Sequence, residues 1–275
     1  EAIFSQAPIL IATHCEEESI ILANTAAARA RFGDEIPIAM HPQIRSREAC
    51  IASTRKAIDL ALKHSSRLHI LHISTAEEVE LLHRAREQSD RITGEVCVHH
   101  LWFSDSDYEQ YGSLIKCNPS IKSSSDRDAL RQAARQGVIS LVATDHAPHL
   151  LSEKEAPYLQ SPSGIPLVQH SLRAMLELAG KGVFTLIDVV RLMCHAPADC
   201  FKISRRGYLR EGYFADLTIV NLDKPSDATT AYRCRWTPFT RFSSTVVHTL
   251  VNGVPVVRNS QLTGLNSSLP LSFDD

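Results

Sequence analysis

The sequence predicts an α/β protein with parallel strands joined by helices, followed by a small β domain. The first observation is an apolar run, residues 138–143, that leads directly into an aspartate and two histidines in residues 144–149. A short run rich in Val, Ile and Leu is typical of a buried strand. The second observation is that three runs upstream end in the same way. The third is that the segments between these runs have helical spacing of apolar residues, as expected for an alternating β/α chain.

The four predicted strands each end in residues that can carry chemistry. The strand at 8–13 ends at His14, 67–71 at His72, 95–98 at His99 and His100, and 138–143 at Asp145. The carboxyl ends of the strands form the catalytic rim of a parallel α/β barrel. One histidine after a strand has little meaning, but four such strand ends are hard to explain by chance. An aspartate beside imidazoles at a rim indicates metal ligands or a general base.

Helices and loops are expected between these strands. Gly33 ends the first helix, Ser46 is a suitable N-cap, and Thr75 with Glu78 forms a capping box. The expected helices span residues 16–32, 46–64, the segment after Thr75, 126–136, 167–178, 186–194 and a short stretch near 198. The expected loops span residues 36–44, 101–125 and 150–166. Long loops at the rim of an α/β domain are usually functional.

The pattern changes after Lys202. Residues 207–212 suggest a turn-rich hairpin, 215–220 a strand, and 246–257 a hairpin with Asn252 and Gly253 at its turn. We therefore expect a partial barrel domain over residues 1–203 and part of a small β-sandwich domain over 204–275.

The composition is that of an ordinary globular protein, with 44% hydrophobic residues, 22% charged residues and a net charge of −2. This charge does not favour nucleic acid or a membrane surface as a partner. Seven scattered cysteines without a C-x-x-C pair favour reduced thiols and a cytoplasmic location. Because only four of a barrel's eight strands are visible, we expect the C-terminal part of a longer protein. The alternative is a complete half-size α/β domain.

Several segments together resemble the amidohydrolase superfamily of metal-dependent (β/α)8 TIM-type barrels, and within it the bacterial dihydroorotases. The order and strand placement of these segments are specific to the superfamily, although each segment alone is weak evidence for it. In the barrel they are residues 13–16, 71–75, 99–101, 118–119, 145–149 and 163–165; in the β domain they are 212–217 and 251–253.

The resemblance implies roles for individual residues. His14 and His72 would bind zinc, and Asp145 would contact the metal and act as general acid and base. The substrate would be held by Asn118, by His149 and by the backbone at Ser163 and Gly164. The family's His-x-His motif, its bridging lysine or aspartate and its substrate-binding arginine cannot be placed in this chain. We therefore expect an incomplete site for one or two Zn²⁺ ions, and an inactive chain when it stands alone.

The implied reaction interconverts dihydroorotate and N-carbamoyl-L-aspartate in pyrimidine biosynthesis. His149 favours this substrate over hydantoin, because dihydroorotate carries a carboxylate that needs a donor. A hydantoinase- or allantoinase-like cyclic amidase remains an alternative. So does a non-catalytic homologue that partners aspartate transcarbamoylase. The implied partners are this small-molecule substrate and either a second copy of the chain or aspartate transcarbamoylase.

The remaining histidines receive other interpretations. His69 is expected in the core and His146 beside the site, whereas His99 and His100 are not assigned as ligands. Structural roles are expected for His41, His170 and His195. Cys15 is expected to be buried in the barrel wall. For Glu16, a helix cap and a group that orients the site remain equally open.

Overall fold

The computed structural model describes residues 1–274, which divide into two compact units. The larger unit comprises Glu1–Gln169 together with Thr230–Pro238. The smaller unit comprises His170–Thr229 and the described part of Phe239–Asp275. Each unit is described by itself below.

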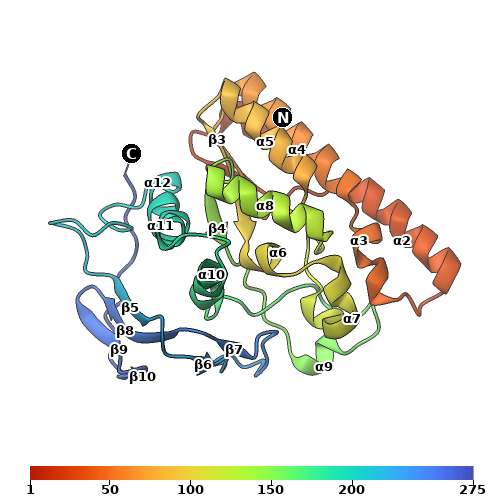
Figure 1. The fold of residues 1–275 in the computed structure, drawn as a ribbon. Helices are drawn as coiled ribbons and strands as arrows, with labels where there is room; N and C mark the ends of the chain where they lie inside the picture. Colours follow the sequence, from red (N-terminus) through yellow and green to blue (C-terminus); the bar gives the residue numbers. More distant parts are fainter. Residues whose placement is uncertain (275) are drawn as a thin grey trace. The chain divides into compact units, whose positions relative to one another are not determined.

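The larger unit is built on a parallel four-stranded sheet in the order β1-β2-β3-β4 (Figure 1). The strands are β1 (Ile11–Thr13), β2 (Leu68–Ile70), β3 (Ile92–Cys97) and β4 (Leu141–Ala143). Thr13 pairs with Ile70, and Cys97 pairs with Ala143. The predicted parallel α/β architecture is confirmed. Because all four strands run in the same direction, the segments that follow them all leave the sheet at the carboxyl ends of the strands.

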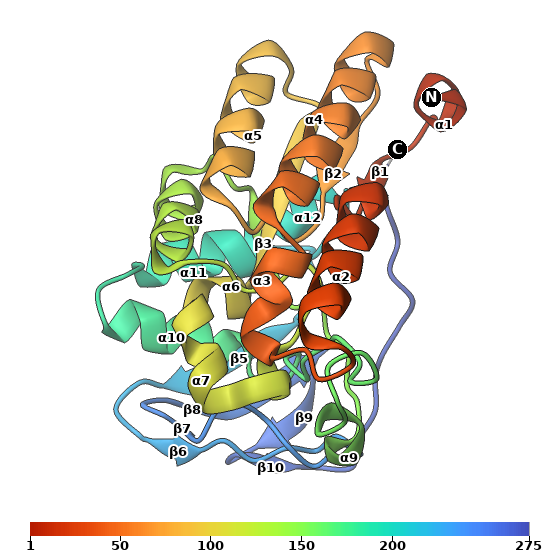
Figure 2. The same cartoon turned by 90° about the vertical axis from the view of Figure 1, so that its right-hand side faces the viewer.

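Helices cover this sheet with small and apolar side chains. The helices α4 (Arg47–His64) and α5 (Ala76–Gln88) lie side by side, and α8 (Ser124–Gln136) packs against α5 (Figure 2). Gly94 in β3 leaves room for this packing, since a Cβ there would lie 2.6 Å from Ile73 Cδ1. The fully buried side chains at this interface include Leu68, Ile70, Ile73, Leu82, Ala85, Ile92, Val96 and Ala134.

Helix ends follow the sequence signals with one exception. Thr75 and Glu78 form the predicted capping box, in which each side chain accepts a hydrogen bond from the other's backbone N–H. Gly33 ends α2 (Glu18–Phe32) with a φ of 62°, as predicted. Ser46 is the N-cap of α4, but its side chain makes no capping hydrogen bond. The prediction for Ser46 is therefore right about position and wrong about the side chain.

All three predicted loops contain short helices instead, since α9 (Leu151–Lys154) lies within 150–166. Residues 36–44 hold the 3-10 helix η1 (Ile38–Met40) and α3 (His41–Ile44), which tolerates a proline in its first turn. The segment 101–125 is also more regular than expected, and Val98 begins a helix rather than ending a strand. Its elements are α6 (Val98–Trp102), η2 (Asp105–Asp107), α7 (Tyr108–Tyr111) and η3 (Gly112–Ile115). The unit also contains α1 (Ala2–Gln6).

The smaller unit combines a few helices with an antiparallel sheet. Its helices are α10 (Ser171–Gly180), α11 (Leu186–Val190), the π-helix η4 (Arg191–His195) and α12 (Ala196–Cys200). Its sheet has the order β10-β9-β8-β5, formed by β5 (Leu217–Asn221), β8 (Thr245–Val251), β9 (Val254–Arg258) and β10 (Gln261–Leu262). A separate ribbon pairs β6 (Ser226–Asp227) with β7 (Arg241–Phe242).

The predicted hairpin at Asn252 and Gly253 is confirmed. Both residues have positive φ, 50° and 82°, which suits a two-residue turn between antiparallel strands. The predicted hairpin at 207–212 is wrong, because this segment contains turns but no strand pairing. Its glycines at 207 and 212 have positive φ, so they bend the chain without a ladder beside it.

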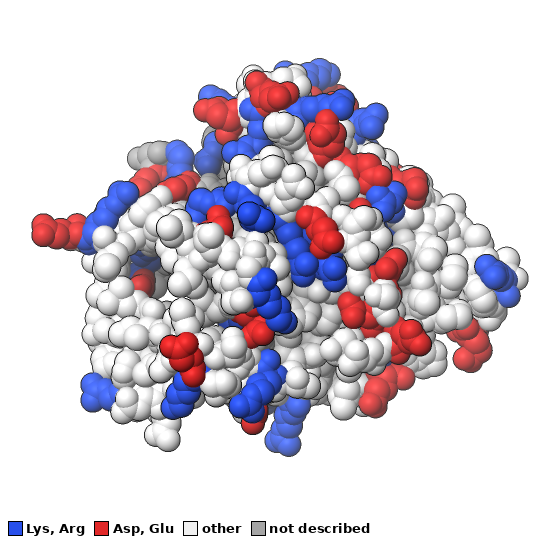
Figure 3. Space-filling view, in the orientation of Figure 1, with Lys and Arg blue, Asp and Glu red and all other residues white. Residues whose placement is uncertain are grey.

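The surface charge distribution and the helices are those of an ordinary globular protein. On the face shown in Figure 3, lysine and arginine side chains are interspersed with aspartate and glutamate. Among the described helices, none combines the length and apolar character needed to cross a membrane.

Candidate active site

The site begins with two histidines at the ends of neighbouring strands. His14 directly follows β1, and His72 follows β2 by two residues. The strand register brings their rings together, with His14 Nδ1 3.0 Å from His72 Nε2 and an edge-to-face arrangement of the rings. His72 has a φ of 37°, an uncommon conformation that turns it out of the strand direction. The structure thus brings together two of the predicted ligands.

The imidazole of His72 is held in its neutral form. It is 6% exposed, and its Nδ1 atom is buried without a hydrogen-bond partner. Burial and the neighbouring His14 lower the pKa of His72, while the charge of Asp145 acts in the opposite direction. Neutral imidazole is the form that binds metal ions.

Asp145 lies beyond the end of β4 and is exposed. Its φ of 44° is a conformation that aspartate tolerates better than most residues. Across residues 1–274, no hydrogen bond or ion pair engages its carboxylate. An exposed carboxylate whose charge reaches His72 can bind a metal ion or exchange protons with a ligand.

The residues present fit a zinc ion. Two imidazole nitrogens that face each other at 3.0 Å can both contact one ion, since Zn–N bonds are about 2.0–2.1 Å long. Imidazole nitrogens and aspartate oxygens are donors that Zn²⁺ accepts, although within residues 1–274 the ligand atoms of His14, His72 and Asp145 do not lie within 4.8 Å of one another.

Glu16 orients His14. Its Oε2 atom lies 3.0 Å from His14 Nε2 and accepts a 2.5 Å hydrogen bond from Arg45. Burial raises the pKa of Glu16, but the hydrogen bond from His14 and the charge of Arg45 bring it below its usual value. A proton on His14 Nε2, donated to Glu16, leaves the Nδ1 lone pair directed at His72. Glu16 also lies outside α2, which excludes the helix-cap interpretation.

Two rim loops bring together three of the predicted substrate residues. His149 Nε2 lies 3.2 Å from the carbonyl oxygen of Ser163. Gly164 has a φ of 148°, and a Cβ there would lie 2.5 Å from the Ala147 oxygen. Only glycine allows the two loops to approach this closely.

Asn118 belongs to a third loop that joins this cluster through the backbone. Gly164 N donates a 2.8 Å hydrogen bond to the carbonyl oxygen of Lys116, two residues before Asn118. The Oδ1 atom of Asn118 is buried and has no hydrogen-bond partner. This acceptor is therefore available to a donor on a ligand.

Two buried lysines hold the rim loops, and sequence reasoning missed both. Lys154 is fully buried and donates to the carbonyl oxygens of Lys116, Pro162 and Gly164 at 2.9–3.0 Å. Lys116 donates to the carbonyls of Tyr158 and Ser161, each at 2.6 Å. Burial lowers the pKa of Lys154 to about 7 and that of Lys116 to about 8. A lysine in a predicted loop gives no sign of such burial.

Trp236 is a third residue without a sequence signal. Its indole N–H donates a 2.8 Å hydrogen bond to the carbonyl oxygen of His149. It belongs to Thr230–Pro238, the only part of the chain after Gln169 that falls in the larger unit. The position of His149 thus depends on a segment 87 residues away in the sequence.

The predicted core position of His69 is confirmed, and the interpretations of the other histidines remain predictions. His69 is fully buried, as predicted, and contacts Thr93 and Glu95. His41 is buried between the Cys117 carbonyl and the Tyr158 hydroxyl. His146 accepts backbone hydrogen bonds from residues 167 and 168 through Nδ1. Cys15 is 2% exposed, as predicted, and burial raises its pKa to about 11.

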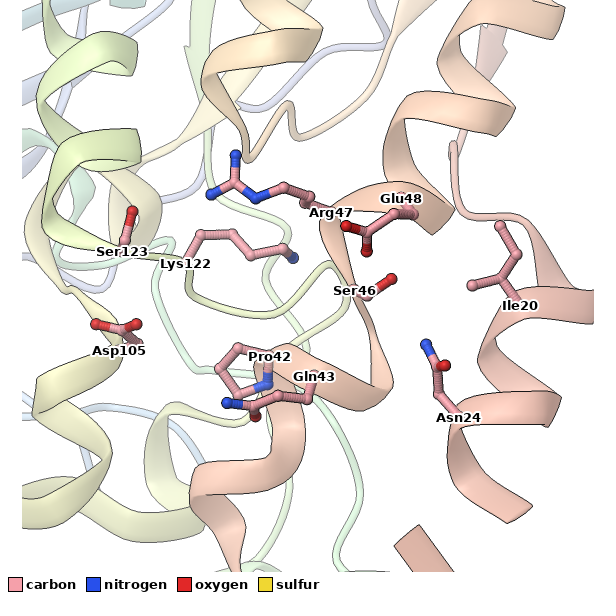
Figure 4. Close-up of a pocket in the computed structure, with 10 residues that line it drawn as sticks. All are labelled: Ile20, Asn24, Pro42, Gln43, Ser46, Arg47, Glu48, Asp105, Lys122 and Ser123. Carbon is pink, nitrogen blue, oxygen red and sulfur yellow. The ribbon is translucent and has the colours of Figure 1, made fainter. Parts of the chain in front are cut away.

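A cavity of about 550 Å³ lies in the larger unit but contains none of the predicted site residues (Figure 4). The amine of Lys122 points into it, toward Ser46 and Glu48. The charge of Lys122 helps to lower the pKa of Glu16. The cavity is therefore linked electrostatically, through Lys122, to the carboxylate that contacts His14.

The model of the amidohydrolase family matches residues 5–256. The chain belongs to the amidohydrolase family. The α/β fold with a parallel sheet agrees with this family, and members of it generally depend on a metal ion. The residues 1–274 of this amidohydrolase also hold a buried Cys/His group that could bind one, formed by Cys97, His99 and His100.

Curated relatives of this amidohydrolase carry the name dihydroorotase. The chain is 30% identical over 232 residues to that of Methanosphaera stadtmanae, covering 83% of this chain and 53% of the relative. It is 33% identical over 265 residues to that of Mycobacterium tuberculosis, covering 92% of this chain and 60% of the relative. This chain spans between half and two thirds of the length of these two relatives.

The solved structures similar to this amidohydrolase include hydantoinases. The L-hydantoinase (dihydropyrimidinase) from Arthrobacter aurescens superposes with a TM-score of 0.89 at 26% identity, covering 94% of this chain and 60% of that one. A dihydropyrimidinase from Brevibacillus agri superposes with a TM-score of 0.86 at 23% identity, covering 94% and 59%. The second similarity concerns the fold alone.

Proposed function

We propose that this chain carries part of the active site of a zinc-dependent dihydroorotase, which interconverts dihydroorotate and N-carbamoyl-L-aspartate in pyrimidine biosynthesis. The observation that carries the proposal is the 3.0 Å approach of His14 Nδ1 and His72 Nε2 beside the charge of Asp145. The dihydroorotases among the relatives favour this cyclic amide over others.

The architecture that accompanies this proposal is the C-terminal portion of a (β/α)8 barrel followed by part of a small β-sandwich. We assign residues 1–203 to the barrel and 204–275 to the β domain. The parallel order of β1 to β4 and the antiparallel sheet of β5, β8, β9 and β10 support this assignment.

His14, His72 and Asp145 would hold the zinc. When bound, the ion would polarise the substrate carbonyl and acidify the attacking water. Glu16 keeps the Nδ1 lone pair of His14 available for the ion.

Asp145 would move the proton during ring opening. Water adds its oxygen to the ring carbonyl carbon, and Asp145 takes the proton that the water loses. The bond between this carbon and the ring nitrogen then breaks, and Asp145 delivers the proton to the departing nitrogen. The exposed, unpaired carboxylate can serve both steps, because no protein group competes for it among residues 1–274.

His149, Asn118, Ser163 and Gly164 would position dihydroorotate. His149 donates through Nε2 to the Ser163 carbonyl, so it would donate through Nδ1 to the substrate carboxylate only as an imidazolium, which carries a proton on both ring nitrogens. Asn118 offers the amide N–H₂ as a donor, and its unpaired Oδ1 can accept from a substrate N–H. Gly164 sets the shape of the loop that carries the Ser163–Gly164 backbone.

The test is hydrolysis of dihydroorotate by the product of the full reading frame, with zinc supplied, beside its Asp145→Asn variant. We expect activity in the parent and a loss of at least about 100-fold in the variant, since proton transfer contributes about 10²–10⁴-fold. Asp90→Asn, an exposed aspartate in a turn, is the matched control. Equal activity of parent and Asp145→Asn would contradict the role of Asp145.

A second candidate is hydrolysis of hydantoins, favoured by the superposition on the Arthrobacter aurescens enzyme. A parent enzyme that opens hydantoin and ignores dihydroorotate would select it. We also propose a cytoplasmic location and either a homodimer or a complex with aspartate transcarbamoylase. A protein without activity on either substrate that binds aspartate transcarbamoylase would support a non-catalytic role.

A further inference from the structure

A second group of side chains that could bind a metal, with no member shared with the His14 and His72 pair, lies at the end of β3. Cys97 is the last residue of β3, and His99 and His100 belong to α6. Their ligand atoms all lie within 4.8 Å of one another. The three residues are between 0% and 3% exposed. A cluster of this composition in the core requires an explanation, because buried polar groups are normally paired.

The hydrogen bonds of this cluster leave several ring nitrogens of its histidines without a partner. His100 Nε2 contacts the carbonyl oxygen of Pro119 at 3.0 Å, which places the ring proton on Nε2 and a lone pair on Nδ1. That Nδ1 atom has no partner, and neither ring nitrogen of His99 has one. A metal-binding histidine commonly has this arrangement, with one nitrogen held by a carbonyl and the other free.

The charges nearby favour a cation. Burial raises the pKa of the Cys97 thiol well above its usual value, and the charges of Glu95 and Asp145 raise it further. Burial likewise lowers the pKa of His99 to about 3, so its ring is neutral. The site thus offers neutral imidazoles and a potentially anionic thiol, with the charges of Glu95 and Asp145 acting on the thiol and that of Lys122 acting on His100. A bound divalent cation would offset the cost of the thiolate.

We propose that Cys97, His99 and His100 form a second, buried site for a thiophilic divalent cation such as Zn²⁺, in addition to the His14 and His72 site. Binding forms one metal–sulfur and two metal–nitrogen bonds and releases the Cys97 thiol proton to solvent. This site is argued from its own side chains and does not depend on which cyclic amide the protein hydrolyses.

The test uses Co²⁺ in the full-length protein after removal of its metals. A thiolate bound to Co²⁺ gives a charge-transfer band in the near ultraviolet, which a site of histidines and aspartate cannot give. We expect this band in the parent and in Cys15→Ser, whose buried thiol lies beside His14. We expect Cys97→Ser to lose the band and to bind one Co²⁺ fewer per chain. No band in the parent, or a band that survives Cys97→Ser, would overturn the proposal.

A second variant covers the case in which the first fails to fold. His99→Phe fills the same space without a polar atom, so its metal-free form should unfold at a higher temperature than the metal-free parent. With Zn²⁺ present, the parent should gain thermal stability through the buried site, and His99→Phe should lose that part of the gain. A variant that binds as many zinc ions as the parent would overturn the proposal.

Discussion

Glu16 Oε2 lies 3.0 Å from His14 Nε2, on the side of the ring opposite His72. Replacing Glu16 by glutamine removes the charge that fixes the proton on Nε2. Loss of such a partner commonly costs about 10–100-fold in metal affinity. We expect a loss of this size for Zn²⁺ in Glu16→Gln, measured by competition with a chromophoric chelator. Glu18→Gln, on the exposed first turn of α2, should match the parent. Equal affinity in Glu16→Gln would show that Glu16 does not orient His14.

The close contact at Gly164 predicts that its replacement distorts the rim. In Gly164→Ala, the new Cβ would meet the Ala147 oxygen at 2.5 Å and the Ala147 Cβ at 2.6 Å, so one of the two loops must move. We expect a loss of about 1–3 kcal/mol in the free energy of unfolding, measured in urea, and an increased KM for the substrate. Gly180→Ala has open space around its Cβ and should be neutral or slightly stabilising. If Gly164→Ala had the same free energy of unfolding and the same KM as the parent, the steric argument would be refuted.

The buried amine of Lys154 predicts a pH dependence of stability. Its pKa is about 7 in the folded protein and near 10.5 in the unfolded chain, so the unfolded state binds more protons between these values. Stability from this group therefore rises with pH above about 7, by at most about 1.4 kcal/mol per pH unit. We expect the stability difference between the parent and Lys154→Met to grow by about 1–2 kcal/mol from pH 7 to about pH 8.5.

Urea unfolding of both proteins at several pH values measures this difference directly. Subtraction cancels the thiols, whose raised pKa values act in the opposite direction at higher pH. Lys56→Met, an exposed lysine on α4, should show a constant difference across the same range. A constant difference for Lys154→Met would mean that its ammonium persists in the core.

The hydrogen bond from Trp236 to the His149 carbonyl predicts a role in substrate binding. Trp236→Phe keeps a phenyl ring but removes the donor and the indole's five-membered ring. One hydrogen bond contributes about 0.5–1.5 kcal/mol, so we expect the unfolding free energy to fall by at least that amount, with the lost packing added to it. If His149 holds the substrate carboxylate, KM should rise more than kcat falls. A kcat that falls with KM unchanged would place the effect on the chemical step instead.

The sequence signals worked best where a local rule decides the structure. The apolar runs before His14, His72 and Asp145 located three strands, since burial in a parallel sheet selects such runs. Thr75 and Gly33 marked helix ends because caps depend on neighbouring residues. Asn252 and Gly253 marked their turn for the same reason.

The signals failed where partners lie far apart in the chain. Nothing local distinguishes Lys154 from a solvated lysine, because its acceptors are backbone carbonyls 8, 10 and 38 residues away, which carry no side-chain signal. The residues near Glu16 in the sequence do not predict its ion pair with Arg45, which lies 29 residues later. The helices in 98–115 were missed because they are short and held by burial rather than by periodicity, as the fully buried Tyr108 and Ile115 illustrate.

Thr230–Pro238 belongs to the larger unit, although the chain on both sides of it belongs to the smaller one. The backbone therefore passes from one unit to the other three times. A single crossover between two genes could not exchange the smaller unit of one relative for that of another without also replacing this segment. Trp236, which donates to the His149 carbonyl, is encoded between the two segments of the smaller unit. The two units are therefore expected to diverge together rather than as interchangeable modules.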